Sequence, residues 1–342
     1  MTPPDGRHSR SVLFPGIGEE GQQRIARFSL AIVGVGAVGA AAAELAARAG
    51  VGRLTLADRD VVEQSNLARQ ALFDADDAAR VAPKAVAAEE RLRKIAPDVA
   101  IRGVVADVTS QNAREVLTGH DLILDASDNF ETRLLVSDAA RALGAPSIYA
   151  ACVSDEGIVA VSVPRVTPCL RCYLETLPPA GSGPTCDTAG VVPTLPALVA
   201  SIAATEALRI ATGGEPRRGV LSLSIWQGGF RSRRTFEDAE PSAECPVCSR
   251  RRFPSLEESG SELVRLCGRR SVQVAPSGRR RPDFDRLESR LSQVGRVRRS
   301  PQLLNADLGD VSLTIFSDGR CVVRGTADPA RARRLYDQYV GG

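Results

Sequence analysis

Four cysteines form two Cys-x-x-Cys pairs, Cys169 with Cys172 and Cys245 with Cys248. Four thiolates match the tetrahedral coordination of a structural zinc ion, which leaves no open position for substrate or water. Each pair alone is also compatible with a redox motif, but the two together favour zinc. Because the pairs are far apart in the sequence, the ion would join two distant loops of one domain.

A second set of residues is suited to binding a nucleotide. Gly34, Gly36 and Gly39 form a Gly-x-Gly-x-x-Gly motif, and Asp58 follows 19 positions after the third glycine. Such glycines let the backbone approach a phosphate at a helix N-terminus, and the Asp58 carboxylate can accept hydrogen bonds from ribose hydroxyls. A tight turn that binds no ligand is the alternative interpretation.

Further charged residues follow in an order that indicates chemistry on a phosphate. Asn66 and Arg69 lie in the sequence Ser-Asn-Leu-Ala-Arg-Gln, Lys84 follows a proline, and Asp128 lies in Ser-Asp-Asn. Attack on an α-phosphate requires cations because charge builds on the phosphoryl oxygens, whereas hydride transfer does not. Arg69 and Lys84 could instead be solvated surface charges, and Asp128 could be a helix N-cap.

The elements that must position these residues predict an α/β fold. Hydrophobic patterns predict strands at residues 29–33, 53–57, 101–105, 121–125, 147–150, 158–163 and 220–225, and helices at 40–49, 83–95 and 194–211. This alternation indicates a Rossmann-like nucleotide-binding fold with a mainly parallel sheet. Since such sheets bind ligands at the carboxyl ends of their strands, Asp58 and Asp128 are expected near the nucleotide.

The composition changes after Cys248. Residues 249–342 contain 19 arginines and 11 acidic residues, which favours a mixed, solvated face over a nucleic-acid-binding surface. We interpret residues 249–262 as a linker and residues 263–342 as a small α+β domain of unknown role. Its signals include a helix capped by Asp283, a hairpin turn at residues 317–319 and a last helix that reaches about Tyr339.

Length and composition exclude several classes of protein. The 342 residues allow about two domains, and 43% hydrophobic with 25% charged residues argues against a disordered chain. No apolar run reaches the ~18 residues of a membrane span, and the polar N-terminus does not resemble a secretory signal. A cytoplasmic location is therefore expected, where eight cysteines indicate metal binding or catalysis more than disulfides.

The motifs together resemble those of the ThiF/MoeB family, bacterial relatives of the ubiquitin-activating enzymes. The likeness runs from about Arg7 to Cys248 and includes the initial Arg-His-Ser-Arg sequence. It implies an adenylation domain with a zinc site over residues 1–248, in a longer form that carries an additional C-terminal domain. Members adenylate the C-terminal glycine of a ubiquitin-like sulfur carrier, of the ThiS or MoaD kind, in thiamine or molybdopterin biosynthesis.

The resemblance also implies roles for individual residues. These are ATP binding by Gly34, Gly36, Gly39 and Asp58, phosphate neutralisation by Asn66, Arg69 and Lys84, Mg²⁺ binding by Asp128, and a contribution of Arg10 to the site of the partner subunit. Cys186 resembles a loop cysteine that forms a thioester or acyl disulfide in some members and is not required in others. The implied partners are a carrier ending in Gly-Gly, a second copy of the chain and a cysteine desulfurase or other sulfur donor.

Other functions remain as alternatives. An NAD-dependent oxidoreductase would use the same glycines and Asp58, but it leaves Arg69, Lys84 and Asp128 without a role. A tRNA-modifying adenylating relative is slightly favoured by the basic tail, whereas the cysteine pairs favour protein adenylation. A non-catalytic nucleotide-binding scaffold is the third class, and the set of phosphate-facing residues counts against it.

Overall fold

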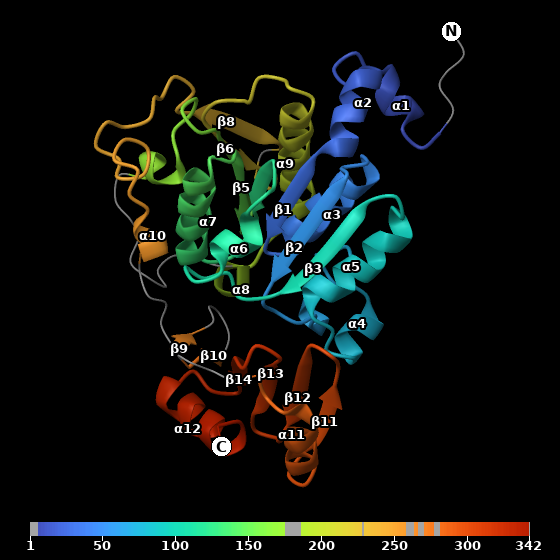
Figure 1. Ribbon diagram of the computed structural model, residues 1–342, viewed down its shortest axis with the longest axis vertical. Coiled ribbons are helices and arrows are strands. Elements are labelled where there is room, and N and C mark those ends of the chain that lie inside the picture. The colour runs from blue at the N-terminus through green and yellow to red at the C-terminus, as the bar shows by residue number, and fades with distance from the viewer. Residues whose placement is uncertain are drawn as a thin grey trace.

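Two β-sheets organise the protein in the computed structural model (Figure 1). The structure describes residues 6–174, 186–227, 229–257, 263–265, 270–276 and 281–341. The larger sheet has the strand order β3-β2-β1-β4-β5-β6-β7-β8, and the smaller has the order β11-β12-β13-β14-β10-β9. Strands β1 to β5 pair in parallel and β6 to β8 are antiparallel, which confirms the predicted Rossmann-like fold.

The larger sheet is built from strands close to those predicted. They are β1 (Ser29–Val33), β2 (Arg53–Asp58), β3 (Ala100–Val105), β4 (Leu122–Asp125), β5 (Ser147–Val153), β6 (Glu156–Ser162), β7 (Val220–Ser224) and β8 (Arg231–Thr235). β8 was not predicted, because it is an arginine-rich edge strand with no alternation of apolar residues.

Helices cover both faces of this sheet. α3 (Ala37–Arg48), α5 (Lys84–Ile95) and α9 (Leu195–Ala211) pack on one face, and α6 (Ala113–Leu117) and α7 (Phe130–Leu143) pack on the other. α3 begins three residues earlier than predicted, inside the glycine motif, because the carbonyl of Gly36 already accepts the amide of Ala40. No described helix is long and apolar enough to cross a membrane.

Short helices surround this core. They are α1 (Ser9–Leu13), α2 (Gly18–Arg27), the 3₁₀ turns η1 (Gln64–Asn66) and η2 (Leu170–Tyr173), α4 (Ala75–Ala79), α8 (Cys186–Ala189) and α10 (Pro254–Glu257). α10 lies within the segment predicted to be a linker, yet it packs on α7.

The smaller sheet forms the antiparallel core of the C-terminal domain. Its elements are β9 (Leu263–Arg265), β10 (Ser271–Val274), α11 (Phe284–Leu291), β11 (Arg296–Arg299), β12 (Leu303–Asp307), β13 (Ser312–Phe316), β14 (Cys321–Arg324) and α12 (Pro329–Tyr339). Two short strands, β9 and β11, were not predicted. The Asp283 carboxylate accepts the amide of Arg286, as its predicted capping role requires.

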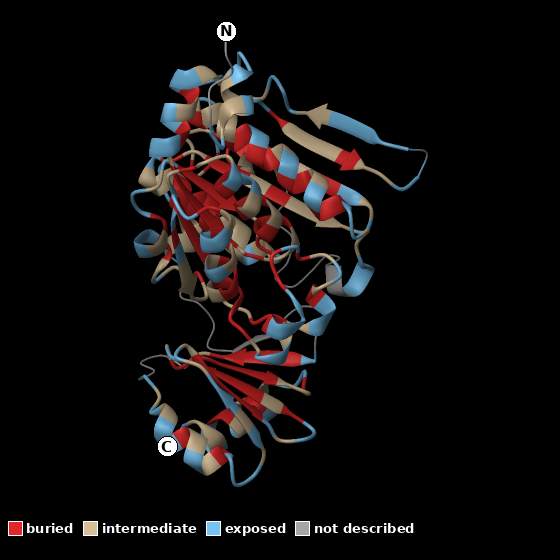
Figure 2. Ribbon diagram, turned by 90° about the vertical axis from the view of Figure 1, so that its right-hand side faces the viewer, coloured by how far each residue is buried: buried red, intermediate tan, exposed pale blue. Residues whose placement is uncertain are grey.

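The two faces of the smaller sheet have different neighbours. One face packs against α11 and α12, and the other faces the larger domain (Figure 2). Both faces are therefore largely buried, and the second lies beside residues that follow β2 and β3. This edge of the larger sheet holds the carboxyl ends of its parallel strands.

Candidate nucleotide and metal sites

The glycine motif and Asp58 are directly connected. The Asp58 carboxylate ends β2, where it accepts the amide of Val35 at 2.6 Å and the amide of Asp60 at 2.7 Å. Burial raises the pKa of Asp58, and the nearby charge of Lys84 opposes that rise. The strand-end carboxylate therefore fixes the backbone of the glycine loop, and its predicted contact with a ribose stays a prediction.

The three glycines serve different purposes. Gly34 has a φ of +85°, and a Cβ there would lie 2.6 Å from the Ala126 carbonyl oxygen. A Cβ on Gly39 would lie 1.8 Å from the Gly34 carbonyl oxygen, so these two positions are fixed by packing. At Gly36 the nearest atom to a Cβ is Gln70 Nε2 at 3.9 Å, which leaves the backbone there accessible to a ligand.

Lys84 is the first residue of α5, and its side chain is only 5% exposed. Its Nζ lies 3.3 Å from Asp60 Oδ2. Buried charges require a partner, and Asp60 provides one while holding the ammonium group beside the end of β2. Lys84 is therefore not the solvated surface charge considered as its alternative role.

Arg59 is a member of this cluster that the sequence analysis did not assign. Its guanidinium lies 3.4 Å from Asp107 and 3.9 Å from Asp128. Burial disfavours its charge, but surrounding carboxylates, led by Asp107, raise the pKa of Arg59 above its usual value. Its position directly after the strand-end Asp58 was the signal that could have identified it.

Asp128 follows β4 in the same region, and its side chain is 74% exposed. The cap of α7 is Asn129, whose side-chain oxygen accepts the amide of Thr132 at 2.8 Å. The alternative that Asp128 is an N-cap is therefore wrong. Its exposed carboxylate has the donor chemistry that Mg²⁺ prefers.

Two side chains near the glycine loop have unsatisfied polar atoms. Asn66 Nδ2 and Gln70 Oε1 are buried without a hydrogen-bond partner among the described residues. Such groups are rare in folded proteins, so these two atoms are free to bind a ligand or an ordered water. Arg69 is partly exposed and donates to the Ser65 carbonyl at 2.8 Å, on the same turn. No role had been assigned to Gln70.

Arg10 lies away from this cluster. It is an exposed residue of α1, and the neighbouring Arg7 donates to the carbonyl of Ile95, at the opposite edge of the sheet (Figure 1). The structure therefore does not bring Arg10 to the nucleotide-binding residues of its own chain.

Cys186 is the first residue of α8, which contacts β5. Its side chain and residues 175–185 lie outside the described part of the structure. The predicted role of its thiol therefore stays a prediction.

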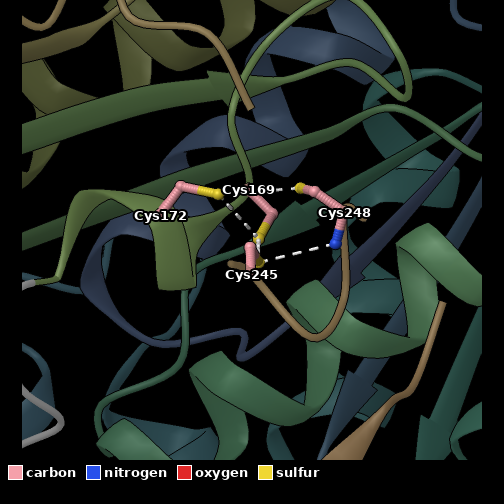
Figure 3. Close-up of side chains that lie close together, drawn as sticks. All are labelled: Cys169, Cys172, Cys245 and Cys248. Atoms are coloured by element: carbon pink, nitrogen blue, oxygen red, sulfur yellow. Dashed lines mark hydrogen bonds between the residues drawn. The ribbon is translucent and has the colours of Figure 1, made fainter. Parts of the chain in front are cut away.

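The four paired cysteines meet at one point (Figure 3). Their sulfur atoms all lie within 4.8 Å of one another, and Cys169 and Cys245 are buried. Four thiolates this close repel one another unless a cation neutralises them, so the donor set fits a structural zinc ion. The two distant segments are thus brought together as predicted.

A buried ion pair anchors this cluster to α7. Arg171, between the first two cysteines, donates to both carboxylate oxygens of Asp138 at 2.9 and 3.0 Å. It also donates to Ser255 of α10 at 2.7 Å. The pair was not predicted, because Arg171 fills a variable position of the Cys-x-x-Cys motif and Asp138 lies outside every motif.

The parallel sheet, with charged residues gathered beyond its glycine loop, defines a nucleotide-binding α/β protein. More particularly, residues 8–247 match the ThiF family, and the chain belongs to this family.

Curated relatives extend this assignment. The chain is 42% identical to the sulfur carrier protein ThiS adenylyltransferase of Bacillus subtilis, over 98% of this chain and 99% of that protein. It is 40% identical to the sulfur carrier protein adenylyltransferase of Thermus thermophilus, over 71% of this chain and 90% of that protein. The Bacillus relative therefore also spans the C-terminal domain.

Solved structures show the same fold. The crystal structure of Escherichia coli MccB with succinimide has a TM-score of 0.61 and 20% identity. The match covers 72% of this chain and 75% of that one. At this identity the likeness concerns the fold alone.

Proposed function

We propose that the protein is an ATP-dependent adenylyltransferase. It activates the C-terminal glycine of a ubiquitin-like sulfur carrier for thiamine or molybdopterin biosynthesis. The observation that carries this proposal is the cluster of Lys84, Arg59 and Asp128 at the end of β2, in a chain of the ThiF family. The names of the Bacillus and Thermus relatives support the same activity and the same kind of substrate.

The reaction needs no general base. The carrier carboxylate is already ionised, so it attacks the α-phosphorus of ATP in line and pyrophosphate leaves, giving an acyl-adenylate. Lys84, Arg69 and Asn66 bind the phosphates, and the cations offset the charge that develops on their oxygens. Gly36 admits the phosphates to the backbone, and Asp58 holds the ribose. Positioning of the reactants and neutralisation of the phosphate charge therefore account for the acceleration of the reaction.

Two metal ions complete the proposal. Asp128 would hold Mg²⁺, which supplies charge neutralisation on the phosphates. Cys169, Cys172, Cys245 and Cys248 would hold Zn²⁺, which stabilises the loops that they join.

The partners follow from the same assignment. A homodimer would place Arg10 of one subunit at the ATP site of the other, since Arg10 is remote from its own. Cys186 acts after adenylation, because carboxylate attack needs no thiol. A cysteine desulfurase or another donor would then supply sulfur, and the reaction belongs in the cytoplasm, where ATP is available.

The chain divides into an adenylation domain (residues 1–248), a connecting segment (249–262) and a C-terminal domain (263–342). The contact of α10 with α7 means that the connecting segment starts as part of the larger domain.

An exchange assay tests the proposal. Purified protein is incubated with ATP, Mg²⁺, labelled pyrophosphate and each Gly-Gly-ended carrier of the host, and the label entering ATP is measured. Exchange that depends on one carrier supports the proposal, and a carrier lacking its last glycine serves as the control. Absence of exchange with every carrier contradicts it.

A further inference from the structure

We infer that the C-terminal domain orders the nucleotide site, with Arg320 as the positioning residue that connects the two. This inference rests on the proposed adenylation activity and assigns a task to a domain whose sequence indicates none. The connecting structure is the segment Arg59–Glu63, which we call the β2 loop because it directly follows β2.

Arg320 is completely buried although it lies at the end of a hairpin turn. Its Nη1 donates to the Arg59 carbonyl at 2.8 Å, and its Nε donates to Asp318 at 3.1 Å. The guanidinium carbon lies 3.6 Å from the ring centre of Phe316. Arg320 is thus held within its own domain while it binds the backbone of the other.

Three further contacts hold the β2 loop and its surroundings. Gln273 Nε2 donates to Asp107 at 2.6 Å, and Arg324 forms an ion pair with Glu63. Val61 inserts into an apolar cluster of the smaller sheet, formed by Leu303, Phe316 and Val322. The C-terminal domain therefore contacts the β2 loop at its beginning, middle and end.

The β2 loop carries groups of the nucleotide site. The side chain of Arg59 lies near Asp128, and Asp60 is the partner of Lys84. Asp107 binds both Gln273 of the C-terminal domain and Arg59 of the site. A shift of the β2 loop would therefore move Arg59 and Asp60 together. It would change both the partner of Lys84 and the surroundings of Asp128, the proposed magnesium ligand.

Stability alone does not account for an arginine at position 320. Burying a guanidinium costs free energy, and a well-packed apolar side chain often serves docking as well or better. An arginine is required where a main-chain carbonyl must be held at a defined place, because its planar group donates in fixed directions. Arg320 thus acts through Arg59 and touches no reacting atom.

The test compares Arg320→Met, which keeps the length of the side chain and removes its donors, with Arg320→Lys, which keeps the charge. Pyrophosphate exchange is measured in the full-length protein at varied ATP concentration. Arg320→Met should show at least about a 10-fold lower kcat/KM for ATP. The KM for the carrier should stay unchanged, and Arg320→Lys should recover part of the loss. Hydrogen exchange should be faster at residues 59–63 in Arg320→Met.

The matched control is Arg333→Met, which removes an exposed arginine from α12 of the same domain and should change neither quantity. If Arg320→Met does not fold, Arg324→Gln tests the same contact surface through a less buried residue and should also lower kcat/KM for ATP. Folded variants with ATP kinetics within about twofold of the parent, or equal losses in the control, overturn the inference. An inactive parent chain contradicts the proposed function instead.

Discussion

At the scale of single residues, the site is organised by alternating charges. Arg59 lies near four carboxylates, and Lys84 pairs with Asp60, so each buried cation has an anionic neighbour. Such pairing offsets part of the free-energy cost of burying the two cations. Phosphates bound here would lie beside positive groups that are already oriented. This arrangement stabilises the negative charge that develops in the transition state.

Asp128→Ala should lower the pyrophosphate exchange rate at least about 100-fold, by analogy with removing one oriented electrostatic group from a transition state. Because the side chain is exposed, the variant should keep its thermal stability. Exchange assays and thermal melts check both expectations. Asp238→Asn, an exposed aspartate outside the site, is the control. Near-normal exchange in Asp128→Ala would remove Asp128 from the proposed mechanism.

Lys84→Arg should reduce exchange at least about 10-fold, because a larger guanidinium cannot take the place of a buried compact ammonium. Lys94→Arg offers a matched control, since Lys94 is the only other lysine and is exposed near the end of the same helix. Exchange is measured with saturating carrier and varied ATP. Equal activity of the two variants would mean that no compact ammonium is needed at position 84.

At the scale of elements, the cysteine-bearing segments are fixed from two sides. The sulfur cluster joins the segment of η2 to the turn before α10, and the Arg171–Asp138 pair joins that segment to α7. Asp138 lies in the second half of α7, and the helix is capped at its N-terminus by Asn129, beside the proposed magnesium ligand Asp128. The cysteine cluster thus supports the helix that positions part of the site, at a distance from the residues proposed to bind ATP.

The protein should contain about one zinc ion per chain, and Cys245→Ser should release it. Loss of the ion should lower the melting temperature by at least about 5 °C, since binding of a structural metal contributes directly to folding. Elemental analysis and thermal melts provide the measurements, with Cys152→Ser as the control outside the cluster. A stable, metal-free parent protein would contradict the zinc assignment.

A histidine between two elements should make stability depend on pH. Burial lowers the pKa of His120 from 6.5, and its ring nitrogens lie 3.1 Å from the Leu117 carbonyl and 2.8 Å from the Thr55 hydroxyl. The unfolded chain therefore takes up this proton at a higher pH than the folded chain. The free energy of unfolding should consequently fall as the pH decreases below about 6.5.

Denaturant titrations at pH 7.5 and pH 5.5 check this expectation. His120→Gln should lose part of the pH dependence, and His8→Gln, at the more exposed of the two histidine positions, should lose less. Identical pH dependence in the parent and His120→Gln would show that His120 does not contribute.

At the scale of the whole molecule, α1 and the C-terminal domain lie at opposite ends of the strands of the larger sheet (Figure 1). The C-terminal domain contacts the β2 loop of its own chain. Arg10 has no such access to its own site, so its implied role requires a second chain. Each ATP site would then be completed by the C-terminal domain of its own chain and by Arg10 of the second chain.

Mixing Arg10→Ala chains with Asp128→Ala chains should restore exchange, because one site of each mixed dimer retains both residues. The recovery should approach about a quarter of parental activity if subunits exchange freely and active sites act independently, as for an arginine supplied in trans. Mass measurement confirms the mixed dimers. With mixed dimers present, no recovery of exchange would exclude action of Arg10 in trans.

The sequence by itself determined the order of strands β1 to β7 and the positions of α3, α5 and α9 in the larger domain, whereas α6 and α7 were not predicted. It also identified the two cysteine pairs and the charged and polar residues that follow the glycine motif in the sequence. These signals are local, because a buried strand, a glycine turn and a Cys-x-x-Cys pair each show in a few consecutive residues. The edge strands β8 and β11 were not predicted. Both are exposed and rich in arginine, so they lack the apolar pattern by which a strand is recognised in a sequence.

Only the tertiary structure decided which residues meet across the chain. Arg59, Asp107 and Arg320 are ordinary charged residues in the sequence, and their contacts join positions 48 and 261 residues apart. Asp128 and Asn129 are both able to cap a helix, and the observed backbone selected Asn129. Such pairings depend on where strands end and how two domains dock, which no local pattern of residue types encodes.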